Sequence, residues 1–100
     1  MMGKLDLIEP VEQQRHWFIP LGRKLSIGRD ESNTARLQVK GISRRHARVR
    51  FSVRRNAWTV KDLGSTNGTF VNGEAIRGRA FIKNGDTIRA GRAVFKFTVL

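Results

Sequence analysis

Apolar and polar residues alternate strictly along residues 47–54 of the chain. The apolar positions are Ala47, Val49, Phe51 and Val53, and the polar positions between them are Arg48, Arg50, Ser52 and Arg54. Successive side chains of an extended chain point to opposite faces, so this period of two predicts a half-buried antiparallel strand with Val53 on its inner face.

Shorter segments of the same character cover much of the remaining sequence. Apolar or β-branched runs lie at residues 5–8, 17–19, 25–27, 57–60, 69–71, 87–88 and 95–99. Asn-Gly pairs, which tolerate a left-handed backbone, follow several of them at 67–68, 72–73 and 84–85. The segment Arg54-Arg55-Asn56 can close a hairpin between its flanking strands. No helical apolar stripe persists along the chain, so the sequence predicts an all-β sandwich of two sheets.

Length and composition narrow the class of protein. A chain of 100 residues accommodates one domain, which we expect to span residues 1–100. The absence of cysteine excludes disulfides and thiolate metal sites. The two histidines, His16 and His46, have no acidic residues at ligand spacing, so we expect no metal and no cofactor. No segment resembles a signal peptide or approaches membrane-spanning length, which predicts a cytoplasmic, intracellular protein with no membrane partner.

The formal net charge of +12 is distributed unevenly along the chain. Residues 1–34 hold five basic and five acidic side chains, whereas residues 35–100 hold fifteen basic and three acidic ones. A field of this sign attracts anionic partners. Arg48, Arg50 and Arg54 equally fit the solvated face of a strand, where charge discourages pairing between sheet edges.

Three polar clusters lie between the predicted strands. The first is Gly28-Arg29, directly after the run that ends at Ile27. Glycine permits a sharp turn there, and a guanidinium can meet a phosphate or carboxylate with two parallel hydrogen bonds. The alternative is an ordinary surface arginine paired with Asp30 or Glu31.

The second cluster, Ser43-Arg44-Arg45-His46, leads into the alternating strand. The Ser43 hydroxyl and consecutive backbone N–H groups of a tight loop can bind an anion. We expect His46 to be a buried or half-buried structural histidine that bonds neighbouring loop backbone. The alternative, a nucleophile and base formed by Ser43 and His46, lacks an orienting carboxylate and a Gly-x-Ser-x-Gly elbow, so we expect no enzymatic activity.

The third cluster, residues 62–73, alone predicts only a hairpin. The combination is specific, because Gly28-Arg29, Ser43-x-x-His46 and Asn67-Gly68 occur in this order. The chain thereby resembles the forkhead-associated (FHA) domain, a phosphothreonine-recognition module, over about residues 25–100. Residues 42–47, 58–73 and 85–88 also resemble this family.

The resemblance implies an FHA-like β-sandwich of about eleven short, mostly antiparallel strands in two sheets, with binding loops at one end. Arg29 and Ser43 match the family's phosphate-binding arginine and serine, and Arg44 and Thr66 match positions that add phosphate contacts. Asn67 matches the asparagine that bonds the peptide backbone. Gly28 and Gly68, which allow the turns, and His46, which braces the serine loop, match the structural positions.

The implied function is a phosphothreonine-dependent protein-protein interaction module that binds phosphorylated peptides from Ser/Thr kinase signalling, a kinase or its substrate. Arg44, Arg79 and Lys83 favour acidic residues beside the phosphothreonine. The alternative is a domain of the same fold whose basic surface, chiefly Arg48, Arg50, Arg54 and Arg55, binds nucleic acid or an acidic protein independently of phosphate recognition. Nucleic acid is not favoured, because the sequence shows no aromatic platform among its basic residues, no recognition helix and no Cys/His finger spacing.

Overall fold

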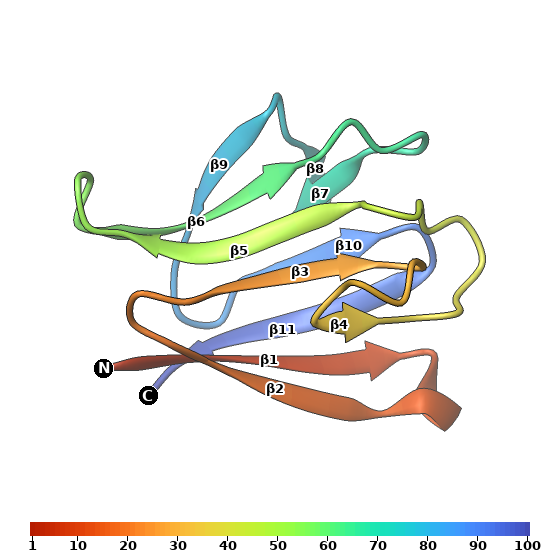
Figure 1. Cartoon of the computed structure of the whole chain (residues 1–100), viewed down its shortest axis with the longest axis horizontal. Helices are drawn as coiled ribbons and strands as arrows, with labels where there is room; N and C mark the ends of the chain where they lie inside the picture. Colours follow the sequence, from red (N-terminus) through yellow and green to blue (C-terminus); the bar gives the residue numbers. More distant parts are fainter.

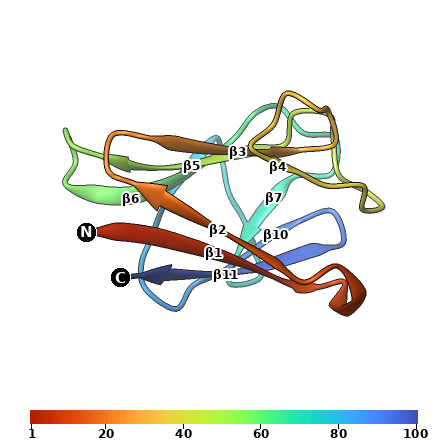
Figure 2. The ribbon, with the colours of Figure 1, turned by 60° about the horizontal axis from the view of Figure 1, so that its bottom comes forward.

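Two twisted β-sheets stack face to face in the computed structural model, which describes residues 1–100 (Figure 1, Figure 2). The elements along the chain are β1 (Met2–Glu9), η1 (Val11–Gln13), β2 (Arg15–Pro20), β3 (Lys24–Gly28), β4 (Ala35–Arg36), β5 (Ala47–Ser52), β6 (Ala57–Asp62), β7 (Thr69–Val71), β8 (Glu74–Ala75), β9 (Arg79–Ile82), β10 (Thr87–Ala90) and β11 (Ala93–Val99). The six-stranded sheet has the order β2-β1-β11-β10-β7-β8, and the five-stranded sheet has the order β4-β3-β5-β6-β9. All neighbours pair antiparallel except β3 and β4. This arrangement confirms the predicted all-β sandwich.

Side chains from the inner faces of both sheets form the core. The largest fully buried ones include Phe95 and Phe97 of β11, Leu5 and Leu7 of β1 and Leu25 of β3. Each side chain of this size stabilises the fold by roughly 1.5–3 kcal/mol when it leaves water. No disulfide supports the core, so packing between the two sheets carries its stability.

The alternation predicted for residues 47–54 breaks off at the end of β5. The prediction that Val53 faces inward was wrong: its side chain is 80% exposed, whereas Ser52 is buried. The strand ends at Ser52, whose hydroxyl accepts a hydrogen bond from the Arg55 N–H at 3.3 Å. Asn56 then takes a left-handed φ of 50°, and the chain returns as β6. The predicted hairpin at this position is confirmed.

Three strands were missed by the hydrophobic pattern. β4 and β8 have two residues each, which is too short to show an alternation. β9 buries Ile82 but leaves Phe81 exposed, so its apolar residues do not fall on one face. These three segments are strands because each pairs with a neighbouring strand, as β9 pairs with β6.

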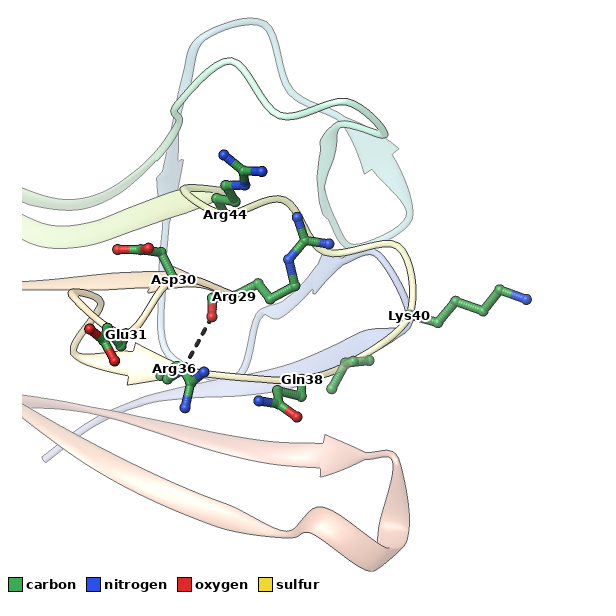
Figure 3. A pocket seen from close by; sticks show the side chains of 8 residues that line it. Arg29, Asp30, Glu31, Arg36, Gln38, Lys40 and Arg44 are labelled. Carbon is green, nitrogen blue, oxygen red and sulfur yellow. Dashed lines mark hydrogen bonds between the residues drawn. The ribbon is translucent and has the colours of Figure 1, made fainter.

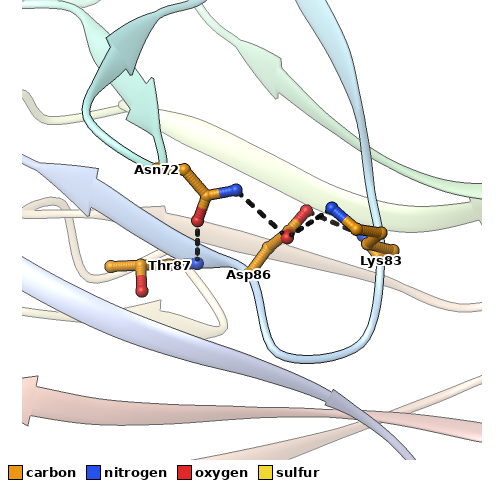
Figure 4. Close-up of polar contacts among 4 residues, drawn as sticks. All are labelled: Asn72, Lys83, Asp86 and Thr87. Atoms are coloured by element: carbon orange, nitrogen blue, oxygen red, sulfur yellow. Dashed lines mark hydrogen bonds and ion pairs between the residues drawn. The ribbon is translucent and has the colours of Figure 1, made fainter.

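A polar network fastens the turn after β7 to the turn before β10 (Figure 4). The Asp86 carboxylate accepts hydrogen bonds from the Asn72 side-chain amide (3.1 Å), the Lys83 N–H (2.9 Å) and the Lys83 ammonium (3.2 Å). The Asn72 side-chain oxygen in turn accepts from the Thr87 N–H at 3.0 Å. Burial raises the pKa of Asp86, but these hydrogen bonds outweigh it and hold the pKa below its ordinary value.

The connections between strands gather at two opposite ends of the sandwich. The β3–β4, β4–β5 and β6–β7 loops lie together at the right of Figure 1, and both termini and the β5–β6 turn lie at the left. The only helix, η1, has three residues, far fewer than a membrane-crossing helix needs. The three predicted polar clusters therefore meet at one end, although they are far apart in the sequence.

Candidate functional site

Arg29 directly follows β3 and is anchored through its backbone. Its N–H donates to the Ser43 carbonyl at 3.0 Å, and its carbonyl accepts from Nε of Arg36 at 3.2 Å. The guanidinium forms no ion pair, because the two ion pairs of the chain are Lys4–Asp6 and Lys83–Asp86. The alternative in which Arg29 pairs with Asp30 or Glu31 is therefore not what the structure contains.

A surface hollow surrounds the Arg29 side chain (Figure 3). Its lining consists of Arg29, Asp30, Glu31, Arg36, Gln38, Val39, Lys40 and Arg44. Half of these side chains are cationic, and the Arg44 guanidinium is also free of ion pairs. Unpaired guanidiniums around an open hollow suit a phosphate or a carboxylate.

The Asp30 carboxylate is occupied within its own loop. It accepts hydrogen bonds from the Ser32 hydroxyl and from the Ser32 N–H, the latter at 3.1 Å. The hydroxyl bond, followed by the backbone bond, holds the pKa of Asp30 below its ordinary value, and the charges of Arg44 and Arg36 act in the same direction. The Arg29 guanidinium is thus available to an anion in the hollow, because the neighbouring Asp30 carboxylate is bonded to Ser32 and not to Arg29.

His46 is fully buried between two of the loops. Its Nδ1 accepts a hydrogen bond from the Ser43 N–H at 3.0 Å, and its Nε2 lies 2.8 Å from the Gly68 carbonyl. A carbonyl can only accept, so Nε2 carries the proton and the imidazole is neutral. His46 therefore ties the β4–β5 loop to the β6–β7 loop. Since both ring nitrogens have partners, the imidazole is not placed as a base for the Ser43 hydroxyl.

Ser43, Thr66 and Asn67 lie where the β4–β5 and β6–β7 loops meet. The Ser43 hydroxyl accepts a hydrogen bond from the Thr66 N–H at 3.0 Å. A hydroxyl that accepts in this way keeps its own hydrogen for donation to another group. The Asn67 side-chain amide donates to the Gly41 carbonyl at 3.0 Å, and both Thr66 and Asn67 are exposed.

Asp62, the last residue of β6, organises the β6–β7 loop. Its carboxylate accepts from the Ser65 hydroxyl (2.5 Å), the Thr69 hydroxyl (2.8 Å) and the N–H groups of Gly64 and Ser65 (3.1 Å each). Partial burial raises the pKa of Asp62, but the hydrogen bonds from Ser65, Thr69 and Gly64 outweigh it, and the net pKa is lowered. Sequence reasoning missed this role, although an Asp two residues before Gly-Ser-Thr is a recognisable loop signal.

Gly28 is needed for a reason other than the predicted turn. It is the last residue of β3 and does not adopt a left-handed φ, so the expectation that it permits a sharp turn was wrong. A Cβ at this position would lie 2.2 Å from the Arg44 carbonyl oxygen and 2.6 Å from Nδ2 of Asn33. Glycine here lets two loops approach closely. Gly68, by contrast, does take a left-handed φ of 85°.

Two further contacts that hold the loops were missed by sequence reasoning. Nδ2 of Asn33, a buried residue, donates to the Asp30 carbonyl (2.8 Å) and to the Arg44 carbonyl (2.7 Å), so it joins the β3–β4 and β4–β5 loops. On the other side, a Cβ at Gly91 would lie 2.5 Å from the carbonyl carbon of Gly41. Neither contact has a local sequence signal, because each joins distant segments.

The structure brings the predicted site residues together at one end of the sandwich. Arg29 and Arg44 line the hollow, whereas Ser43, Thr66 and Asn67 form the adjoining junction between two loops and do not line it. The Ser43 carbonyl bonded to the Arg29 N–H connects the two parts. Two guanidiniums free of ion pairs thus lie at the same end of the sandwich as the Ser43–Thr66 junction.

Comparison with known sequences identifies close relatives. The sequence profile of the FHA domain matches residues 25–91. FhaB of Mycolicibacterium smegmatis is 37% identical over 79 residues, which are 78% of this chain and 50% of that protein. Glycogen accumulation regulator GarA of Mycobacterium tuberculosis is 39% identical over 67 residues, which are 67% of this chain and 40% of that protein. The chain spans about half the length of these relatives, or less.

Solved structures share the architecture. The FHA domain of CT664 from Chlamydia trachomatis superposes with a TM-score of 0.90 at 22% identity, covering 100% of this chain and 99% of that one, and shows the shared fold. A chain from an analysis of phosphothreonine-dependent FHA domain interactions gives a TM-score of 0.85 at 29% identity, with coverage of 100% and 98%. Mycobacterium tuberculosis EmbR, in complex with a low affinity phosphopeptide, gives 0.81 at 29% identity, with coverage of 98% and 24%. With the profile match over most of its length, the chain belongs to the FHA domain family.

Proposed function

We propose that this chain is a phosphothreonine-dependent protein-protein interaction module whose partner is a phosphorylated protein of Ser/Thr kinase signalling. The observation that carries the proposal is that Arg29, whose guanidinium forms no ion pair, is bonded through its backbone to Ser43, whose hydroxyl accepts from Thr66 and keeps its own hydrogen. A phosphothreonine brings close to two negative charges and three strong acceptor oxygens. Such a group fits a site that presents charged and neutral donors, where four cationic side chains outnumber the carboxylates of Glu31 and of Asp30, the latter already bonded to Ser32.

Each predicted residue has a part in this proposal. Arg29 and Arg44 meet the phosphate with their guanidiniums, and the Ser43 and Thr66 hydroxyls donate to it. Asn67 bonds the backbone of the bound peptide and fixes its position. The complex of EmbR with a phosphopeptide and the phosphothreonine-dependent interactions of another family member support the phosphopeptide-binding function in which these residues take part.

The proposed module acts by binding and performs no reaction. The pairing of His46 with backbone groups supports this, because no base is directed at the Ser43 hydroxyl. In this proposal a kinase attaches the phosphate to the partner protein before the module binds it.

Calorimetric titration with phosphothreonine, phosphoserine and unphosphorylated peptide pools at physiological salt tests the proposal. We expect heat only with the phosphothreonine pool, and its loss in Arg29→Ala, where charge-assisted hydrogen bonds worth about 2–4 kcal/mol disappear. Arg55→Ala is the matched control, since it removes the same charge from the β5–β6 turn at the opposite end. Equal binding of all pools, or wild-type affinity in Arg29→Ala, would refute the proposal.

A further inference from the structure

The outer face of the five-stranded sheet carries a continuous set of positive charges. Strand register places Lys24 opposite Arg50, Arg48 opposite Lys61, and Lys61 opposite Arg79. These five residues point away from the core, because their neighbours along the strands, such as Val49 and Val60, are buried. We call the set Lys24, Arg48, Arg50, Lys61 and Arg79 the cationic sheet face.

Nothing on this sheet neutralises the cationic sheet face. The sheet contains a single acidic residue, Asp62, whose carboxylate is taken up by Ser65, Thr69 and loop N–H groups. None of the five cations takes part in an ion pair. Like charges directly opposite each other on neighbouring strands destabilise a sheet. The fold therefore tolerates a set of unfavourable pairs on this face.

On the six-stranded sheet, several charged side chains have partners. Asp6 lies directly opposite Lys96 on one side and His16 on the other, and Lys4 forms an ion pair with Asp6 at 3.5 Å. The Arg89 guanidinium lies over the Phe70 ring, 4.1 Å from its centroid. The surplus of charge is thus concentrated on one sheet, although both sheets face solvent.

Protection of sheet edges accounts for only part of the cationic sheet face, because Arg79 lies on the edge strand β9 but other members lie on interior strands. β5 lies between β3 and β6, and β6 lies between β5 and β9, so both are interior strands. Charge discourages pairing with another chain only at a free sheet edge, and Arg48, Arg50 and Lys61 lie away from any such edge. Arg48 and Arg50 lie on the outer face of β5 as predicted, but not at an edge, and Arg54 lies in the turn beyond Ser52. A binding role for the face therefore becomes the better explanation.

The position of the face indicates what occupies it. Arg48 follows His46 by two residues, and Lys61 directly precedes Asp62, so the first row of cations begins beside the phosphate-binding loops. β5, Ala47–Ser52, covers about 17 Å, roughly the length of five or six residues of an extended bound peptide. A hollow at the far end adds Arg23 and Arg54 next to Lys24 and Arg50. A chain held at the phosphate site can therefore continue across the face.

We propose that the cationic sheet face binds an acidic segment, rich in Asp and Glu, of the same protein that presents the phosphothreonine. The attachment of that segment to the phosphothreonine rests on the proposed function, but its attraction to the face does not need Arg29. A protein segment fits better than nucleic acid, because Phe81 is the one exposed aromatic side chain on this sheet and bases would lack a series of stacking partners.

Fluorescence anisotropy at physiological salt tests the proposal with four labelled peptides. One carries phosphothreonine with neutral flanks, two carry an additional run of about six Asp and Glu residues before or after it, and one carries the acidic run without phosphate. The length of the run matches the six residues of β5. We expect one of the two acidic extensions to lower Kd about fivefold or more, since several exposed charge pairs that are individually weak act together. The unphosphorylated acidic peptide should bind weakly and equally well to Arg29→Ala.

Matched double variants locate the effect. Arg48→Gln/Lys61→Gln, and separately Arg50→Gln/Arg79→Gln, should remove the gain from the acidic extension and leave the affinity for the neutral phosphopeptide unchanged. Lys4→Gln/Lys96→Gln removes equal charge from the other sheet and should keep the gain. No gain from either extension, or an equal loss in the control, overturns the inference even if the neutral phosphopeptide still binds. Tighter, face-dependent binding of a single-stranded DNA oligomer of equal charge would assign the face to nucleic acid and also overturn it.

Discussion

The Ser43 hydroxyl accepts a hydrogen bond from the Thr66 N–H at 3.0 Å. The two residues are separated along the chain by β5 and β6, because Ser43 lies in the loop before β5 and Thr66 in the loop after β6. The bond leaves the hydroxyl hydrogen free and fixes the oxygen in place. Ser43→Ala should therefore weaken phosphothreonine binding by about 1.5–3 kcal/mol, the value of a hydrogen bond to a charged group.

The same substitution should lower the free energy of unfolding by no more than about 1.5 kcal/mol, because Thr66 is exposed and water can replace the lost partner of its N–H. Calorimetry and urea denaturation of the same sample separate the two effects. Unchanged phosphopeptide affinity in Ser43→Ala would remove Ser43 from the site.

Gly28→Ala should damage both the fold and the site. Its Cβ would meet the Arg44 carbonyl oxygen at 2.2 Å, so the β4–β5 loop has to move, and overpacking of this kind costs about 1–3 kcal/mol. Gly22→Ala is the control: its left-handed φ of 81° strains a side chain, but no atom lies within 4 Å of the new Cβ.

We expect Gly22→Ala to lose stability and retain phosphopeptide affinity, whereas Gly28→Ala loses both. Thermal unfolding and peptide titration check this pair. If the two variants bound the peptide equally well, the close approach of Gly28 and Arg44 would have no importance for the site.

Stability should fall at low pH partly through Asp62. Its pKa is lower in the folded chain than the ordinary value of 3.8, so its ionised form stabilises the fold at neutral pH. This contribution is complete above the unfolded pKa and is lost as the pH falls through the folded pKa, so unfolding should become easier below about pH 4.

Asp62→Asn should be less stable than the parent at neutral pH and should lose less stability on acidification, because Asp30 and Asp86, whose pKa values are also lowered, still respond to pH. Urea denaturation from neutral pH to about pH 3 measures both quantities. A parent-like slope with pH in Asp62→Asn would contradict the role of this carboxylate.

Lys61→Glu should stabilise the chain. The substitution places a carboxylate directly opposite Arg48 and Arg79 and converts two like-charge pairs into two opposite-charge pairs. The free energy of unfolding should rise by roughly 0.5–1 kcal/mol, as cross-strand pairs of this kind contribute.

Lys96→Glu is the mirror control, because it places a second carboxylate opposite Asp6 and should lower stability by a similar amount. Chemical denaturation at low ionic strength compares the two variants most sensitively. A loss of stability in Lys61→Glu would show that the like-charge pairs of the cationic sheet face are not a burden on the fold.

Part of this architecture and site could be predicted from the sequence because the signals are local. The alternation before Ser52 predicts β5, and the Arg54-Arg55-Asn56 segment predicts the hairpin that follows it. The order of Gly28-Arg29, Ser43-x-x-His46 and Asn67-Gly68 indicated the family and the loops that meet at one end. Such features depend on residue spacing along one segment, which the sequence contains by itself.

Only the tertiary structure decided the features that depend on two distant segments. Val53 turned outward because β5 ends at Ser52, two residues before the alternation ends, and Gly28 is required by a carbonyl sixteen residues further along the chain. Asn33 joins two loops, and the cationic sheet face exists because strand register sets Arg48 beside Lys61. Hydrophobic pattern and turn chemistry are properties of a single stretch of chain, whereas close approach and cross-strand charge are properties of pairs that only folding brings together.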